Sequence, residues 1–450
     1  MFTPYMRNLL AAAVAALIIT GCNSDNPVGV SPPEQVTTAA VRTFAPMERS
    51  LNPGTDDWEP TVATDPAAPY VYVVTTRYGS PACAKKCPDP ALVITVSNDG
   101  GATFGPERYL CVCRGMPGQN DPQVAVARDG TVYAAWLNDF VPGVVFSRST
   151  DHGRTWTAPK PLMGKLDFSD KPILAISPSG MDVYVAFNAS DSYIVSSHDH
   201  GTTFSAPVRT NADDRYWFAD GGYVAPDGTV TFTEASYTQT STGPVFIHTI
   251  RSDDGGGSWK STRIDAVAEQ PDCTSAGCPP DFYGPSVGLG GTGSNRLVMT
   301  YNGAVNPKEP QRIFVRRSSD GGRTWSARTE LSLAPASANG AFPAAVGGGH
   351  GDVRVWYMDD RAGPGQWNVW FRRSDDDGRT WSAETRLSNA AGGAPYKSAA
   401  GFAHPYGDYG GIAITSAGAT FAAWGEGISF AGPGGTWMSR LTTASVEVAP

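Results

Sequence analysis

The chain has 450 residues, 41% of them hydrophobic, with 51 glycines, 36 prolines and a formal net charge of −9 at pH 7. The negative charge and the lack of a basic cluster argue against nucleic acid as a partner. Glycine and proline in these amounts are typical of a turn-rich all-β protein, and a chain of this length can bury a large core.

The amino end reads as a secretion signal over residues 1–21, with a positive start at Arg7 and an apolar stretch over residues 9–19. This stretch is too short for a spanning helix. Ile19-Thr-Gly-Cys22 resembles a bacterial lipobox, in which the cysteine is acylated and becomes the first mature residue. The resemblance implies lipidation at Cys22, export and a membrane anchor. Because Asn23 follows the cysteine, it favours the outer membrane; an ordinary cleaved signal is the alternative.

Residues 22–50 are expected to hold the lipidated N-terminus, a flexible tether and a closing strand, and residues 51–450 the folded domain. Six copies of the pattern Ser-x-Asp-x-Gly-x-Ser/Thr-Trp/Phe lie in that domain, and we call each copy an octad. The octads begin at Ser97, Ser149, Ser197, Ser252, Ser318 and Ser374 and end at Phe104, Trp156, Phe204, Trp259, Trp325 and Trp381.

The residue types of the octad are those that a tight turn needs. Short aspartate and serine side chains accept hydrogen bonds from backbone N–H groups downstream, and glycine permits a left-handed backbone. The final aromatic ring supplies an apolar group to bury beneath the turn. The octads are therefore interpreted as structural elements and not as catalytic ones.

The octad aspartates are 52, 48, 55, 66 and 56 residues apart. A period near fifty with strand-like sequence in between predicts an all-β fold of four-stranded antiparallel blades in a β-propeller. The octad resembles the Asp-box, or BNR repeat, of sialidases and other propellers. The resemblance covers residues 61–441 and implies membership of the sialidase-like superfamily, although it specifies the fold better than the activity.

A second repeat lies between the octads, in which two short apolar strands flank a tight turn such as Asp129-Gly130. These pairs begin near Thr61, Gln123, Ile173, Gly222, Ser286, Ala344 and Gly411. They predict seven blades, with six as the alternative. The last unit has no octad and little chain for a fourth strand. Residues 36–44 are similar to the strands after the octads, so we expect an N-terminal strand there to close the ring.

The order of strands within a blade assigns each loop to a face. Octads join the third strand to the fourth and the Asp-Gly hairpins join the first to the second, so both lie on one face. The opposite face carries the loops between second and third strands and the links between blades. Because the links are rich in acidic and aromatic residues, a concave mouth over the axis is the predicted binding site.

A glycoside hydrolase needs two carboxyl groups, as acid and base or as acid and nucleophile. The candidate catalytic residues are Asp57, Asp121, Asp170, Glu234, Asp408 and Tyr409. Stacking platforms and arginines that pair with carboxylates would hold an acidic sugar. The candidate substrate-binding residues are Trp58, Trp217, Tyr283, Tyr406, Arg77 and Arg361.

A family sialidase also carries an Arg-Ile-Pro motif on an early inner strand. The corresponding strands here read Glu59-Pro-Thr-Val and Asp121-Pro-Gln-Val, so the catalytic roles of the family are not transferred. Three functions stay open. The first is an exo-sialidase-like glycoside hydrolase of unknown substrate, and the second is a non-catalytic propeller that binds glycan or protein. The third is a cell-envelope assembly factor.

Six cysteines remain beyond Cys22, an even number that suits an oxidising compartment. The segment with Cys83 and Cys87 could cross-link to that with Cys111 and Cys113, and Cys273 to Cys278; a zinc site is the less favoured alternative. No cofactor and no metal are expected. Calcium would suit an acidic channel, but no calcium-loop motif supports it. We expect a monomer that binds a glycan or glycoconjugate.

Overall fold

The computed structural model describes residues 34–35, 48–51, 55–79, 88–110, 118–139, 142–239, 243–268, 284–395, 397–398, 401–405, 409–427 and 434–442. All of its regular elements are β-strands. Within these ranges, no helix is both long and apolar enough to span a membrane. The predicted signal segment, Cys22, the six other cysteines and residues 36–44 lie outside them.

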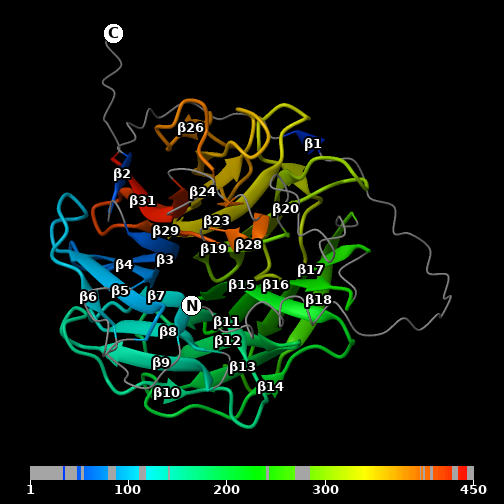
Figure 1. Cartoon of the computed structure of the whole chain (residues 1–450). Helices are drawn as coiled ribbons and strands as arrows, with labels where there is room; N and C mark the ends of the chain where they lie inside the picture. The colour runs from blue at the N-terminus through cyan, green and yellow to red at the C-terminus, as the bar shows by residue number, and fades with distance from the viewer. Residues whose placement is uncertain are drawn as a thin grey trace.

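Seven antiparallel sheets form a ring, with the first strand of each sheet nearest the centre (Figure 1). The seven-blade prediction is therefore confirmed. Blade 1 consists of β3 (Asp56–Thr64), β4 (Val71–Tyr78), β5 (Ala91–Ser97) and β6 (Arg108–Tyr109), and blade 2 of β7 (Gln119–Val126), β8 (Val132–Asn138), β9 (Gly143–Ser149) and β10 (Lys160–Pro161). Blade 3 consists of β11 (Asp170–Ile176), β12 (Val183–Ala189), β13 (Asp191–Ser197) and β14 (Val208–Arg209). Blade 4 consists of β15 (Tyr216–Val224), β16 (Val230–Tyr237), β17 (Val245–Ser252) and β18 (Lys260–Val267).

Blades 5 to 7 complete the ring in the same order. Blade 5 consists of β19 (Val287–Gly293), β20 (Arg296–Gly303), β21 (Arg312–Ser318) and β22 (Thr329–Glu330). Blade 6 consists of β23 (Gly340–Gly349), β24 (Asp352–Asp359), β25 (Asn368–Ser374) and β26 (Thr385–Arg386). Blade 7 contains β29 (Gly411–Ile414), β30 (Thr420–Gly427) and β31 (Gly434–Leu441). The link between blades 6 and 7 carries the hairpin of β27 (Lys397–Ser398) and β28 (Gly401–Pro405).

An N-terminal strand closes the ring, as predicted. It is β2 (Glu48–Ser50), which pairs antiparallel with β31 and completes blade 7. The backbone N–H of Leu51 continues the ladder by donating to the Thr436 carbonyl at 3.0 Å. The strand thus lies nearer the domain than the predicted segment 36–44. A further N-terminal pair of residues, β1 (Glu34–Gln35), adds in parallel to the outer strand β22 of blade 5.

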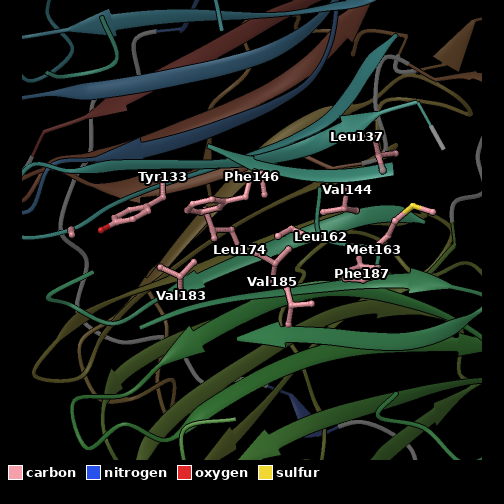
Figure 2. Packing of buried hydrophobic residues seen from close by; sticks show 13 residues of the cluster. Tyr133, Leu137, Val144, Phe146, Leu162, Met163, Leu174, Val183, Val185 and Phe187 are labelled. Carbon is pink, nitrogen blue, oxygen red and sulfur yellow. The ribbon is translucent and has the colours of Figure 1, made fainter. Parts of the chain in front are cut away.

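The core consists of apolar layers between successive blades. Figure 2 shows the layer between blades 2 and 3, where Tyr133 and Phe146 pack with Val183, Val185 and Phe187. Both faces of a middle strand are covered by a neighbouring blade, so its apolar residues run almost without interruption, as in β8 and β12. This packing holds the inner strands around the axis.

The octads form the turns that their sequence predicts. In blades 1 to 6 the third strand ends at an octad serine, as β25 ends at Ser374. The Ser374 hydroxyl accepts from the Gly378 N–H at 2.8 Å, and Asp376 accepts from the Thr380 N–H at 2.8 Å and the Thr380 hydroxyl at 2.7 Å. The Trp381 side chain lies fully buried beneath this turn.

The strand register of blade 2 confirms the predicted faces. Val132 pairs with Val126 and also with the octad residue Ser149, so the first hairpin and the octad lie at one end of the blade. At the opposite end Asn138 pairs with Gln119 and Gly143. The start of the inner strand, with its acidic residues, therefore lies on the face without octads, which we call the mouth face.

Candidate functional site

A β-bulge interrupts the inner strand of five blades close to the mouth face. In four of them one residue has positive φ: Glu59 (56°), Asp121 (52°), Lys171 (43°) and Phe342 (51°). Each of these residues precedes a proline. Non-glycine residues rarely adopt this conformation, and a bulge redirects the side chain that it carries. The bulges therefore decide which residues of the links reach the axis.

Asp57 lies within β3, before the bulge between Trp58 and Thr61, and not in a link between blades, where the sequence analysis placed it. It pairs with Arg77 of β4 and is fully buried. Its carboxylate accepts from Arg77 Nε at 2.7 Å and Nη2 at 2.9 Å, and Arg77 also contacts Glu107. Burial lowers the pKa of Arg77, but the hydrogen bonds that it donates to both carboxylates outweigh this effect and hold the pKa above its usual value. Asp57 and Arg77 thus form an ion-pair network inside blade 1.

Arg361 has an equivalent environment in blade 6. Its guanidinium donates to Asp359 at 2.8 and 2.6 Å and to Glu384 at 2.8 Å. The same group lies 3.8 Å from the ring centroid of Trp370. Both predicted sugar-binding arginines, Arg77 and Arg361, therefore have carboxylate partners within the protein.

Residues from four blades meet at the axis on the mouth face. Lys171 Nζ of blade 3 lies 3.8 Å from Asp220 Oδ1 of blade 4 and 5.7 Å from the Phe218 ring. It also lies 5.6 Å from the ring of Tyr409, in the segment leading into blade 7. The Tyr409 hydroxyl donates to the Pro122 carbonyl of blade 2 at 3.4 Å. We call Lys171, Asp220, Phe218 and Tyr409 the axial cluster.

Carboxylates and aromatic rings of blades 1 and 2 extend this surface. The Asp121 N–H donates to Glu59 Oε2 at 3.4 Å, and the Tyr78 hydroxyl donates to Asn120 at 3.3 Å. Burial, followed by the charges of Glu59 and Asp121, raises the pKa of Tyr78. The Trp58 ring packs against Tyr78 with 4.7 Å between centroids. The side chains of Asp121 and Trp58 are both partly exposed on the mouth face.

Glu234 lies on β16 at the interface between blades 3 and 4 and is fully buried. Its Oε1 accepts from the Ser192 hydroxyl at 2.8 Å, while Oε2 has no hydrogen-bond partner. Burial raises the pKa of Glu234 to about 8; the Ser192 bond opposes the shift and the charge of Asp220 adds to it. The carboxyl group therefore keeps its proton at neutral pH.

Asp170 and its neighbours border the same interface. Asp170 pairs in register with Asn188, whose amide donates to the Tyr216 hydroxyl at 3.4 Å. The pKa of Tyr216 is raised, mainly by burial and further by the charge of Asp170. The Asn188 side-chain oxygen is buried without a hydrogen-bond partner. Asp170 therefore belongs to the polar interface that also holds Glu234.

Trp217 lies in the core between blades 3 and 4, with 1% of its surface exposed. Its indole N–H donates to Asp213 at 2.8 Å, and its ring lies 4.1 Å from that of His248. In this position the Trp217 ring offers no open face for a sugar. Asp408, Tyr283 and Tyr406 lie outside the described residues.

Sequence reasoning expected Asp220 to approach the axis with the other acidic residues of the links, but it did not select Asp220, Lys171 or Glu59 as a catalytic or binding residue. It overlooked Ser192. The dipeptides Glu59-Pro60, Asp121-Pro122 and Lys171-Pro172 are the sequence signal that could have identified the bulges. Within the described part of the chain, no three His, Cys, Asp or Glu side chains lie close enough together to hold a metal ion. The calcium hypothesis gains no support from these residues.

No family model and no curated protein matches the sequence. Solved structures do resemble it. An ulvan lyase of polysaccharide lyase family PL25 has 13% identity and a TM-score of 0.51, covering 87% of this chain and 95% of that one. A Trypanosoma rangeli sialidase in complex with DANA has 12% identity and a TM-score of 0.44, with 91% and 58% coverage.

YCF48 bound to D1 peptide has 14% identity and a TM-score of 0.49, covering 92% of this chain and 99% of that one. This chain spans less than two thirds of the Trypanosoma sialidase but nearly the whole length of the lyase and of YCF48. Identities this low show the fold and not the activity. The chain is a seven-bladed propeller whose structural neighbours include sialidases and a polysaccharide lyase.

Proposed function

We propose that this protein is a glycan-acting propeller and that the mouth between blades 3 and 4 is a glycoside hydrolase site. The observation that carries the proposal is the pairing of two carboxyl groups in different environments. Glu234 is buried with a pKa of about 8, whereas Asp220 lies beside the ammonium group of Lys171. Environments that separate two carboxyl groups in this way assign one as acid and the other as base or nucleophile.

In this proposal Glu234 is the general acid. Its proton would pass from Oε2 to the glycosidic oxygen, and the bond to the anomeric carbon would break. Asp220 would either take a proton from water as that water attacks the carbon, or attack the carbon itself, according to the separation of the two groups in the complex. After direct attack, water would release the sugar from Asp220 and give its proton to the ionised Glu234. The ammonium group of Lys171, 3.8 Å from Asp220 Oδ1, would attract the negative charge of this carboxylate. Asp121, Asp170 and Tyr409 would line the surface that receives the sugar.

The sialidase-like form of the proposal makes a demand on the arginines. A sugar carboxylate bound by Arg77 or Arg361 would have to replace Asp57 or Asp359, which already hold these guanidinium groups. The exo-sialidase hypothesis therefore requires these ion pairs to rearrange, whereas a neutral glycan makes no such demand on the arginines. The proposal rests on the site, because the likeness to sialidases and to the lyase extends to the fold alone.

Turnover of fluorogenic glycosides by the chain from residue 23 onward tests this proposal. The panel should include an α-sialoside together with neutral hexosides. We expect hydrolysis of at least one glycoside, and a loss of about 10²–10⁴-fold in Glu234→Gln and in Asp220→Asn. The variant Val208→Ala, at an exposed position outside the mouth, is the control and should keep full activity. Unchanged rates in Glu234→Gln would remove this residue from the mechanism.

A non-catalytic glycan-binding propeller is the second candidate. It is favoured by the position of the Lys171 ammonium group, which lies 5.6 Å from the centroid of the Tyr409 ring, and by the complete burial of Glu234. In that case the panel would show no turnover while calorimetry with the same sugars would show saturable binding. Trp58→Ala should then weaken binding, because its partly exposed ring is the remaining described tryptophan among the predicted platforms.

We further propose that residues 1–21 are removed on export and that Cys22 is acylated, so that a tether holds the propeller to the membrane. The lipobox-like ending of the signal supports this proposal. The Asp-box resemblance of the octads supports the sialidase-like assignment in the same way. Globomycin treatment should cause the unprocessed precursor to accumulate, and Cys22→Ser should prevent acylation. Processing and acylation that are unaffected by both would contradict the proposed anchor.

A further inference from the structure

The ammonium group of Lys171 occupies a defined cage at the axis. One side of the cage is the carboxylate of Asp220, at 3.8 Å. Two others are the aromatic rings of Phe218 and Tyr409, with centroids at 5.7 and 5.6 Å. Only 9% of the Lys171 side chain and 6% of the Asp220 side chain are exposed. The cage is thus assembled from blade 4 and the segment leading into blade 7, while its occupant comes from blade 3.

These are the groups that recognise an organic ammonium ion. Aromatic rings attract a cation through their negative faces when it lies within about 6 Å, and the attraction increases when water is excluded. A carboxylate supplies the opposing charge. Because the distances to both rings lie within this range, the position of Lys171 Nζ shows that the cage accepts a primary ammonium group.

The surroundings of the cage favour cations over anions. Glu59 and Asp121 hold the bulge positions of blades 1 and 2 that correspond to Lys171 in blade 3. Two arginines on this face, Arg77 and Arg361, are paired with carboxylates of their own blades, whereas Arg215 donates to Ser236 and to the Pro244 carbonyl. Beyond the cage, Glu234 Oε2 is buried without a hydrogen-bond partner, and the charge of Asp220 acts on this carboxyl group. A protonated carboxyl oxygen of this kind suits a ligand with oxygen acceptors beside its amine.

We propose that the cage is a recognition site for the protonated amine of an amino sugar, and that Lys171 fills it while no ligand is bound. This inference deepens the proposed function by naming the substrate class. Lysine carries its charge on a flexible four-carbon stem, so its ammonium group can leave the cage without a change of the backbone. A glycan with a free amine would take the same carboxylate and the same two rings.

Chemical rescue of Lys171→Ala in the full chain tests this proposal. The substitution empties the cage and leaves Asp220 without the ammonium group of Lys171. We expect thermal unfolding at a lower temperature than in the wild type, and glucosamine should restore part of the loss. The matched sugar N-acetylglucosamine, which has no charge on nitrogen, should not. Calorimetry with Lys171→Ala should show that glucosamine binds at least about tenfold more tightly than N-acetylglucosamine. A tenfold ratio of the two dissociation constants corresponds to a difference of about 1.4 kcal/mol in binding free energy.

Two further variants keep the test decisive. Lys171→Met fills the cage with a neutral chain of similar length, so it should bind neither sugar at this position. Asp220→Asn in the Lys171→Ala background should abolish the preference for glucosamine and also fold more readily, since a neutral amide then replaces the buried charge that faced Lys171. Equal binding of both sugars to Lys171→Ala would overturn the inference, as would a preference for glucosamine that survives Asp220→Asn.

This result is separable from the test of catalysis. Preferential binding of glucosamine without turnover of any glycoside would support the cage and count against the hydrolase. Hydrolysis of neutral or acidic glycosides by the wild type, together with equal binding of glucosamine and N-acetylglucosamine to Lys171→Ala, would support the hydrolase and overturn the cage.

Discussion

Ser192 of blade 3 donates a 2.8 Å hydrogen bond to Glu234 of blade 4, and this bond crosses the interface between two blades. Ser192 lies on β13 beside Asn188 of β12 in the strand register. The bond satisfies one carboxyl oxygen of Glu234 and leaves the other without a partner. A buried acid held in this way links the stability of the propeller to pH.

The first prediction concerns that link. Burial raises the pKa of Glu234 from 4.5 to about 8, so the folded protein keeps a proton that the unfolded chain releases in this interval. The stability contributed by the protonated group is complete below pH 4.5 and is lost as pH rises towards 8. The slope is at most about 1.4 kcal/mol per pH unit. Glu234→Gln should remove it.

Urea unfolding of the wild type and of Glu234→Gln between pH 5 and pH 8 measures this difference. The buried His248 contributes in the opposite sense, because burial lowers its pKa to about 3, so stability rises with pH up to its ordinary value near 6.5. This contribution is common to both proteins and cancels in the comparison. Parallel stability curves for the two proteins would show that Glu234 is ionised in the folded state.

The second prediction separates Asp57 from Asp121. Asp57→Asn removes the charge opposite Arg77 in a buried network, which should cost about 3–5 kcal/mol of folding free energy. Asp121→Asn lies at a partly exposed position and should change stability by about 0.5 kcal/mol or less. Chemical denaturation compares the two variants directly. Wild-type stability together with lost turnover in Asp57→Asn would instead identify Asp57 as a catalytic residue.

The third prediction tests the structural role of the octads. Asp376→Ala removes the acceptor for the N–H and hydroxyl groups of Thr380 and should cost about 1–2 kcal/mol. Trp381→Ala leaves a cavity under the same turn and should cost about 3–5 kcal/mol. Binding and turnover at the mouth face should be unchanged in Asp376→Ala at 20 °C. A large loss of either property with intact stability would show that the octads take part in function.

The fourth prediction addresses ring closure. Leu51→Pro removes the N–H that donates to the Thr436 carbonyl and should weaken the join between the N-terminal strand and blade 7. We expect a lower unfolding midpoint and faster proteolysis at the amino end. Leu51→Val keeps the donor and serves as the control. Identical midpoints for the proline and valine variants would show that this bond does not contribute to closure.

The fold could be predicted because its determinants are local and repeated. The octad beginning at Ser374 carries its own hydrogen-bond partners within eight residues, and hairpins such as that at Asp129-Gly130 depend on neighbouring residues alone. The fifty-residue period then fixes the arrangement in space. The closing strand was harder to locate, because β2 has only three residues and pairs with β31 from the other end of the chain.

The site was predicted less completely, because it depends on geometry that only the closed ring creates. The bulge at Glu59 separates Asp57 from the axis, although the two residues are neighbours in one link. Trp58 and Trp217 were equivalent as sequence candidates, but only Trp217 is covered by an adjacent blade. The contact between Lys171 and Tyr409 joins blades that are not neighbours in the chain.

The pH dependence of kcat/KM for the best glycoside of the panel, measured in the wild type and in Glu234→Gln, tests the central claim most directly. The account predicts that wild-type kcat/KM falls above about pH 8, as Glu234 loses its proton, and that Glu234→Gln retains at most about 1% of the activity at pH 6. A wild-type profile that stays flat to pH 10, with Glu234→Gln fully active, would contradict it.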